Sequence, residues 1–425
     1  MPGVVAGLCK MLEEQGSLPL PKILSPAIRI ARQGAVLSKP QAYITHLLKP
    51  ILLDTPEITA LYAPEGQFVT AGDRLRFPEL ANTLEALGKE GVGLFYTGVV
   101  AQTILADQRA HGGLVTGRDL AAYRVRRTTP LSIHYRGYTI LLPPPSSSGG
   151  PLIAFSLRLL GAIPLENVAH NGFDHLRTLA EVMRVTNVAR ARWEEVKHDD
   201  DGVQVFLGDE HVRQCGQKLQ KAIDGHPQEP EPNLPKDPPN TTHISVADGN
   251  GMLVGITTSA GENAGFVVGN TGIMLNNMLG EIDLHPNGFH KTPPGQRFAT
   301  MMSPAIVLKG SQPVLVVGSG GSSRLRTAIL QVISNVLDFK LPLKEAVEAP
   351  RLHFEANVAQ LEGGIDPGVA DQLEDDLDRS SAGDTVNRWG KRTMFFGGTH
   401  TVARQGNTWA AAGDPRRGGA TEIVD

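Results

Sequence analysis

Thr241 is the residue of this chain best suited to covalent chemistry. It opens a segment whose residues alternate with the period of two that is typical of a β-strand. It belongs to the heptapeptide Asn240-Thr241-Thr242-His243-Ile244-Ser245-Val246. Residues 226–240, which end at the same Asn240, hold six prolines in fifteen positions. A threonine hydroxyl becomes a useful nucleophile when a base removes its proton, and a threonine at a chain start can use its own α-amine. An α-amine has a pKa of about 7.7–8.0, close to working pH, which suits general base catalysis.

This chemistry requires a cut, because the α-amine of Thr241 exists only after the peptide bond to Asn240 is broken. The same hydroxyl can make that cut by attacking the Asn240 carbonyl, and water can then hydrolyse the resulting ester. The proline-rich residues 226–240 predict an extended, mobile loop that would let the new ends separate. Two simpler interpretations remain open for Asn240-Thr241-Thr242: a glycosylation acceptor, or β-branched residues that only fill a strand.

A glycine-rich run, Gly318-Ser319-Gly320-Gly321-Ser322-Ser323, is the second feature with chemical potential. It lacks the Gly-Lys-Ser/Thr ending of a phosphate-binding loop. The other interpretation is a tight turn whose backbone N–H groups point at a developing oxyanion.

The elements that must position these residues follow from periodicity. Helical spacing is found in residues 6–36, 78–110, 152–160, 173–196 and 324–337. Strand patterns are found in residues 131–142, 242–257, 305–308, 314–317, 399–404 and 408–412, with an Asp248-Gly249-Asn250-Gly251 turn inside the second of them. Helices therefore dominate the first part of the chain and strands the second, which predicts an α+β fold.

Composition excludes several classes of protein. The chain has 425 residues, 41% hydrophobic and 20% charged, with a net charge of -4, so neither a disordered chain nor a nucleic-acid-binding one is favoured. No apolar run reaches the roughly 18 residues of a membrane-spanning helix. Cys9 and Cys215 are too few and too isolated for a disulfide framework or a metal site, and we expect no cofactor and no metal.

Several further segments, in the same order along the chain, resemble the γ-glutamyltransferase family (γ-glutamyltranspeptidase, or glutathione hydrolase). They are Gly112–Thr116 with Asp119–Tyr123, Tyr135–Tyr138, Pro143–Gly150, Asn240–Val246, Gly272–Asn277, Met302–Pro304, Gly318–Arg324 and Asp414–Arg416. The resemblance covers nearly the whole chain. It implies the four-layer αββα sandwich of the N-terminal-nucleophile hydrolases, with self-cleavage between Asn240 and Thr241.

The products of that cut would be a large-subunit part, residues 1–240, and a small-subunit part, residues 241–425, which together form one structural domain. The resemblance makes Thr241 the catalytic nucleophile and Ser259 its supporting hydroxyl, at a position where the family has a second threonine. It assigns the oxyanion turn to Gly321 and Ser322, where the family usually has two glycines.

Substrate recognition is where the chain departs from the family pattern. Glu281 falls at the acidic position that binds the substrate α-ammonium, and Met278 replaces a polar residue there. Gly261 replaces an asparagine, for which Glu262 or Asn263 could substitute. Thr300 and Met301 replace a serine pair that contacts the substrate α-carboxylate. The substrate is expected to be a small γ-glutamyl compound such as glutathione, with an amino acid or peptide as acceptor.

The resemblance begins inside the family's large subunit. The segment whose arginine contacts the substrate carboxylate has no counterpart here, and no replacement arginine is evident from the sequence. The first residues carry no signal-peptide pattern, and no compartment follows from this. Two alternatives stay open: an amidase of the cephalosporin-acylase kind, suggested by Met278, Gly261 and Met301, and an inactive remnant that remains a single uncut chain.

Overall fold

The computed structural model describes residues 1–225, 231, 241–281, 284–285, 288–379 and 383–424. These residues form two compact units. The first unit comprises Met1–Thr128 and Ala260–Met278, and the second comprises Thr129–Ser259 and Leu279–Asp425. The proposed cut between Asn240 and Thr241 falls within the span of the second unit. Asn240 itself, and the loop predicted for residues 226–240 apart from Glu231, lie outside the described residues.

The first unit is helical. Its elements are α1 (Val4–Gln15), α2 (Leu20–Gln33), β1 (Ala35–Val36), α3 (Lys39–Leu47), α4 (Lys49–Leu52), α5 (Pro56–Tyr62), β2 (Arg74–Leu75), α6 (Pro78–Glu90), α7 (Gly93–Tyr96), α8 (Val99–Ala110) and α9 (Gly117–Ala122). Its core gathers Leu94, Phe95 and Ile104 with Val268 and Leu275. The segment 260–278 is therefore part of this helical core, although it follows the β5–β6 hairpin in the chain.

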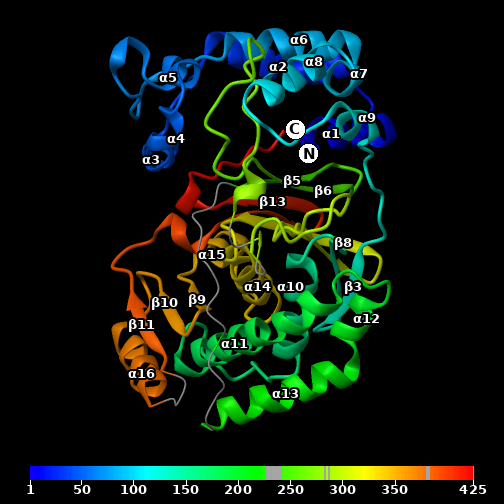
Figure 1. Cartoon of the computed structure of the whole chain (residues 1–425). Helices are drawn as coiled ribbons and strands as arrows, with labels where there is room; N and C mark the ends of the chain where they lie inside the picture. Colours follow the sequence, from blue (N-terminus) through cyan, green and yellow to red (C-terminus); the bar gives the residue numbers. More distant parts are fainter. Residues whose placement is uncertain (226–230, 232–240, 282–283, 286–287, 380–382, 425) are drawn as a thin grey trace. The chain divides into compact units, whose positions relative to one another are not determined.

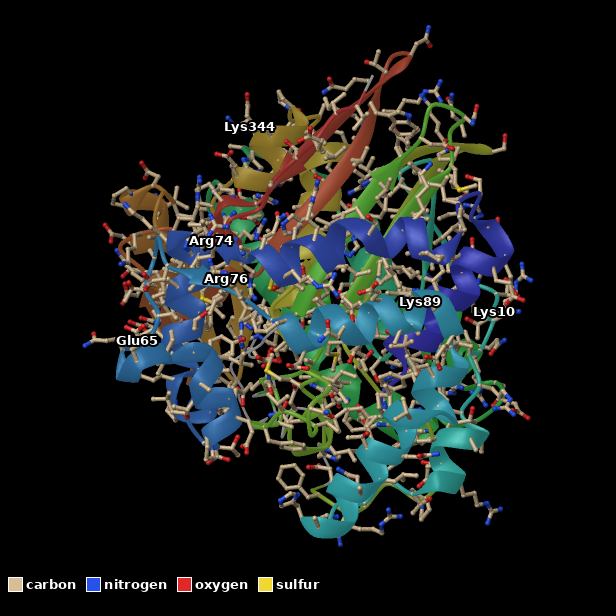
Figure 2. The ribbon with its side chains drawn as sticks, turned by 90° about the horizontal axis from the view of Figure 1, so that it is seen from above. Lys10, Glu65, Arg74, Arg76, Lys89 and Lys344 are labelled. Atoms are coloured by element: carbon tan, nitrogen blue, oxygen red, sulfur yellow. The ribbon has the colours of Figure 1, made fainter. Side chains whose placement is uncertain are left out.

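Charged side chains cover the outer faces of these helices, as amphipathic packing requires. Lys10 on α1 pairs with Glu13, and Lys89 on α6 pairs with Glu85, at 2.9 and 3.3 Å between nitrogen and oxygen (Figure 2). Exposed pairs of this kind contribute little to stability. The burial of the apolar faces is what stabilises the unit.

The second unit contains the sheets. Its helices are α10 (Gly149–Gly161), α11 (Phe173–Val196), α12 (Gly202–Leu207), α13 (Asp209–Ile223), α14 (Arg324–Leu337), α15 (Leu343–Glu348) and α16 (Pro367–Asp378). Its strands are β3 (Leu131–Tyr135), β4 (Tyr138–Leu142), β5 (Thr241–Ala247), β6 (Leu253–Ser259), β7 (Ala305–Lys309), β8 (Gln312–Gly320), β9 (Leu352–Glu355), β10 (Val358–Leu361), β11 (Thr385–Arg388), β12 (Gly398–Gln405) and β13 (Thr408–Gly413).

Six strands form the main sheet, in the order β13-β12-β8-β7-β4-β3, with every neighbouring pair antiparallel. The β5–β6 hairpin packs on one face of this sheet, mostly on β8, while α10 and α14 pack on the other face (Figure 1). A second, smaller sheet has the order β11-β10-β9 and contacts α11. The α+β class expected from the sequence is confirmed, and so are the helices and strands predicted from periodicity.

Candidate active site

Thr241 is the first residue of β5 and faces the end of the neighbouring strand. Its partner in the antiparallel register is Ser259, the last residue of β6. Both residues are partly exposed. The two hydroxyl-bearing residues that the sequence singled out are thus brought together at one end of the hairpin, with Thr241 neither deeply buried nor fully in solvent. Their catalytic roles remain predictions.

The β5–β6 hairpin lies close to β8 because β8 has glycines where the two meet. A Cβ atom added at Gly320 would lie 2.2 Å from the main-chain oxygen of Thr241 and 3.3 Å from its Cβ. A Cβ atom added at Gly318 would lie 2.3 Å from the ring of His243. Since real Cβ atoms do not approach other atoms this closely, only glycine fits at both positions. The glycine run therefore brings Thr241 against the end of β8.

The turn that follows β8 has an unusual backbone conformation. Gly321 has a φ of 138°, and Ser322 has a φ of 51°, in the left-handed region where a non-glycine residue costs on the order of 1–2 kcal/mol. Helix α14 begins two residues later, at Arg324. A helix N-terminus carries a partial positive charge and backbone N–H groups, which favour an anion. The turn next to Thr241 is therefore suited to stabilise a developing oxyanion.

His243 fixes β5 in this position. Its ring nitrogens lie 2.8 Å from the Thr257 hydroxyl and 2.9 Å from the Ser245 hydroxyl, and Ser245 donates to the His400 carbonyl oxygen at 2.8 Å. Burial, together with the neighbouring His400, lowers the pKa of His243 to about 3. A ring that stays neutral at working pH is suited to holding strands together, and it is a poor proton acceptor.

The positions predicted to contact the substrate carboxylate lie beside α10. The carbonyl oxygen of Thr300 accepts hydrogen bonds from the backbone N–H of Ser148 at 2.9 Å and of Gly149 at 3.3 Å, and Met301 is buried. Both residues line a small pocket together with Arg190, Glu194 and Lys197. Arg190 is buried, which was not predicted, because an arginine inside a long helix usually belongs to a solvated face.

The remaining predicted substrate residues are divided between the units. Glu262 and Met278 belong to the first unit, where the backbone N–H of Glu262 donates to the Asn277 side chain at 2.7 Å and that of Met278 donates to the Asn276 side chain at 3.2 Å. Glu281 belongs to the second unit and is partly exposed. The involvement of these three residues in substrate binding stays a prediction.

A buried ion network lies near the end of β13. Asp414 is fully buried and accepts hydrogen bonds from the Arg351 guanidinium at 2.7 Å and the Arg416 guanidinium at 3.1 Å. Arg416 also donates to Glu362 at 2.7 Å. The segment Asp414-Pro415-Arg416 therefore forms a buried ion pair within itself. Burial by itself would raise the pKa of Asp414, but the two arginines outweigh it and lower the pKa to about 2.

We expect Asp414→Asn to lower the free energy of unfolding by about 3–5 kcal/mol, because it leaves two arginines buried without their shared carboxylate. Denaturant titration measures this loss. The carboxyl's pKa is depressed in the folded state, so its contribution is complete above the ordinary carboxyl pKa and disappears as pH falls toward about 2. Asp371→Asn, at an exposed carboxylate on α16, is the control and should change stability by less than about 1 kcal/mol. Equal effects of the two variants would contradict this account.

Among the residues that the structure describes, no group of three or more His, Cys, Asp or Glu could hold a metal ion. Within the same residues, no helix is both long and apolar enough to cross a membrane.

Comparison with known proteins places this arrangement in a family. The family model described as gamma-glutamyltranspeptidase matches residues 1–424. The glutathione hydrolase proenzyme of Escherichia coli (strain K12) is 31% identical over 394 residues, which cover 88% of this chain and 67% of that protein. The Acylase ACY 1 proenzyme of Pseudomonas sp. (strain V22) is 31% identical over 390 residues, with the same two coverages of 88% and 67%. The chain thus spans about two thirds of the length of these curated relatives.

Solved structures support the same assignment. The crystal structure of cephalosporin acylase from Bacillus halodurans matches with a TM-score of 0.87 and 26% identity, covering 100% of this chain and 78% of that one. The match confirms the expected α+β fold of the N-terminal-nucleophile hydrolase type. With a family model that matches almost every residue, the chain belongs to the γ-glutamyltranspeptidase family of enzymes.

Proposed function

We propose that this chain is a self-processing γ-glutamyltransferase or glutathione hydrolase whose nucleophile is Thr241. The observation that carries the proposal is the position of Thr241 at the first residue of β5, in contact with Gly320 and next to the turn of Gly321 and Ser322. Thr241 is only partly buried, and the turn beside it leads into the N-terminus of α14, which favours an anion such as the oxyanion.

In the precursor, the Thr241 hydroxyl attacks the Asn240 carbonyl carbon. The C–N bond of that peptide breaks as the ester forms, and the leaving nitrogen takes a proton to become the α-amine of Thr241. Water then hydrolyses the ester, which leaves residues 1–240 and 241–425 as two products. The products stay together as a heterodimer, consistent with the name proenzyme that the E. coli relative carries.

In the mature enzyme, the α-amine of Thr241 takes the hydroxyl proton while the oxygen attacks the γ-carbonyl of a γ-glutamyl amide. The C–N bond breaks, the leaving amine takes the proton, and a γ-glutamyl ester remains on Thr241. Water or the amine of an amino acid or peptide then takes the acyl group. Ser259, opposite Thr241 in the hairpin, supplies a second hydroxyl that keeps the nucleophile oriented.

In this proposal Thr300 and Met301 keep their predicted place near the substrate α-carboxylate. Glu281, Met278 and Glu262 keep theirs near the α-ammonium.

A second candidate function is an amidase that transfers a different acyl group. Two observations favour it: the structural match to a cephalosporin acylase, and the apolar or absent side chains at Met278 and Gly261. A glutaryl group has the same carboxylate as a γ-glutamyl group and lacks the α-ammonium, so it would not need polar residues at these two positions.

Intact mass and N-terminal sequencing of the purified protein test the proposal. We expect two polypeptides, one of which begins at Thr241. Hydrolysis of a γ-glutamyl anilide should then exceed that of a glutaryl amide, and the reverse order would favour the acylase. A single uncut chain that hydrolyses neither compound would contradict both and indicate the inactive remnant.

A further inference from the structure

Glu231 is a buried carboxyl group in the proline-rich segment that leads to the proposed cut. Its exposed fraction is 6%, although it lies only ten positions before Thr241 among residues rich in proline and charge. Glutamates are almost never buried to this degree unless they are paired. One carboxyl oxygen of Glu231 accepts from the Asn187 side-chain amide at 3.1 Å, and the other accepts from the Ala356 backbone N–H at 2.6 Å.

The backbone of Glu231 is held as well. Its N–H donates to the Asn357 side-chain oxygen at 2.8 Å, and its carbonyl oxygen accepts from the Asn357 amide at 3.5 Å. Ala356 and Asn357 form the two-residue turn between β9 and β10, with φ values of 54° and 58°. Both residues follow Thr241 in the chain. Glu231 therefore bonds directly to the part of the chain that would become the second product.

The same contacts continue toward the oxyanion turn. The Asn187 side-chain oxygen accepts from the Arg326 guanidinium at 3.2 Å, and that guanidinium lies 3.7 Å from Glu355. The Ser323 hydroxyl donates to Glu355 at 2.7 Å, and Ser323 directly follows Gly321 and Ser322. A continuous set of buried polar contacts thus joins Glu231 to the base of the turn, and such networks hold their members in one arrangement.

We propose that Glu231 is a docking residue that holds the end of the first product on the β9–β10 turn of the second, before and after the cut. In the precursor this contact also ties the chain ten residues before Thr241 to the polar contacts that end at Ser323, beside the oxyanion turn. The relevance of this tie to the cut depends on the proposed function, whereas the docking itself does not. Glu231 does not touch the reacting atoms, so it acts as a positioning residue.

The protonation of Glu231 gives this docking a pH dependence. Burial raises its pKa to about 8, against the opposing hydrogen bonds from Asn187 and Ala356. Of the charged groups nearby, Glu355 also raises the pKa and Arg184 lowers it. Since the folded pKa lies above the ordinary carboxyl value, the docked state loses relative stability as pH rises toward about 8. Glu231 should therefore detach from the β9–β10 turn more readily in mildly alkaline than in mildly acidic solution.

The first test is the kinetics of processing. Glu231→Ala removes two hydrogen bonds to a carboxyl, which corresponds to about a tenfold change in a rate or an equilibrium constant. We expect the two products to appear about tenfold more slowly on a denaturing gel. We also expect them to separate at lower urea concentration in size-exclusion chromatography. Asp224→Ala, at an exposed carboxylate just after α13, is the control and should behave like the parent.

The second test works without self-cleavage and so separates the two proposals. In a Thr241→Ala background, the chain remains a single precursor, and an added protease reports how well the segment is docked. Glu231→Ala should be cut in residues 226–240 about tenfold faster than its parent, with circular dichroism confirming that both are folded. Cutting of the parent should accelerate as pH rises toward about 8, and Glu231→Gln should remove that acceleration. Equal cutting rates in Glu231→Ala and its parent would overturn the docking role, whatever happens at Thr241.

Discussion

Replacing Thr241 with alanine should leave the chain as a single polypeptide with no measurable γ-glutamyl hydrolysis. The alanine variant has no hydroxyl to attack the Asn240 carbonyl, so neither the cut nor the new α-amine is produced. Loss of the nucleophile in enzymes of this kind lowers the rate by several orders of magnitude, about 10⁴-fold or more. Denaturing gels follow the cut, and release of aniline from a γ-glutamyl anilide follows the activity.

Thr242→Ala is the matched control for this experiment. Thr242 is the same residue type, one position further along β5, and its side chain is exposed whereas that of Thr241 is partly buried. Successive side chains of a strand point to opposite faces, so Thr242 should contribute nothing to the chemistry. Thr241→Ser should keep both cut and activity because it keeps the hydroxyl. Normal processing of Thr241→Ala, or loss of processing in Thr242→Ala, would remove Thr241 from the mechanism.

Gly320→Ala should slow processing strongly although it adds only one methyl group. The new carbon would lie 2.2 Å from the Thr241 main-chain oxygen, so the start of β5 must move away from β8. A displacement of about 1 Å at reacting groups can lower a rate by about 10²-fold. We therefore expect at least about a hundredfold slower appearance of the two products, measured by gel densitometry.

Gly249→Ala separates this local effect from a general effect of replacing a glycine. Gly249 lies in the turn of the same hairpin, and a Cβ atom added there would meet no other atom within 4 Å. It should process at the parental rate. Thermal denaturation of both variants shows whether the fold survives, because overpacking typically costs about 1–3 kcal/mol. A folded Gly320→Ala variant that is cut at the parental rate would contradict the contact between β8 and Thr241.

The sequence alone predicted many of the helices and strands and the candidate nucleophile. Helix α11 was predicted at residues 173–196 and is found at Phe173–Val196. The β5–β6 hairpin was predicted from alternation around the Asp248–Gly251 turn, and its register pairs Thr241 with Ser259. These predictions succeed because periodicity and turn chemistry are local properties of a chain.

The sequence did not reveal the smaller sheet. Strand β11 pairs in parallel with β10 across the intervening helix α16, which is a non-local arrangement. Parallel neighbours require a crossover, so the residues of each strand carry no turn signal for the other. Glu231 contacts the turn between β9 and β10. The sequence does not predict this contact, because the two segments lie far apart in the chain.

Only the tertiary structure shows which glycines allow close packing and which charged residues are buried. The sequence shows Gly318 and Gly320, but only the packing of β5 on β8 explains why neither position can carry a side chain. The sequence shows Glu231 among prolines and Arg190 within a predicted helix, where charged residues are ordinarily exposed. In the structure both side chains are buried. Burial depends on contacts between segments that lie far apart in the chain, whereas residue types and their spacing can be read from one short stretch of sequence. The candidate nucleophile could therefore be selected from the sequence, whereas its surroundings could be seen only in the fold.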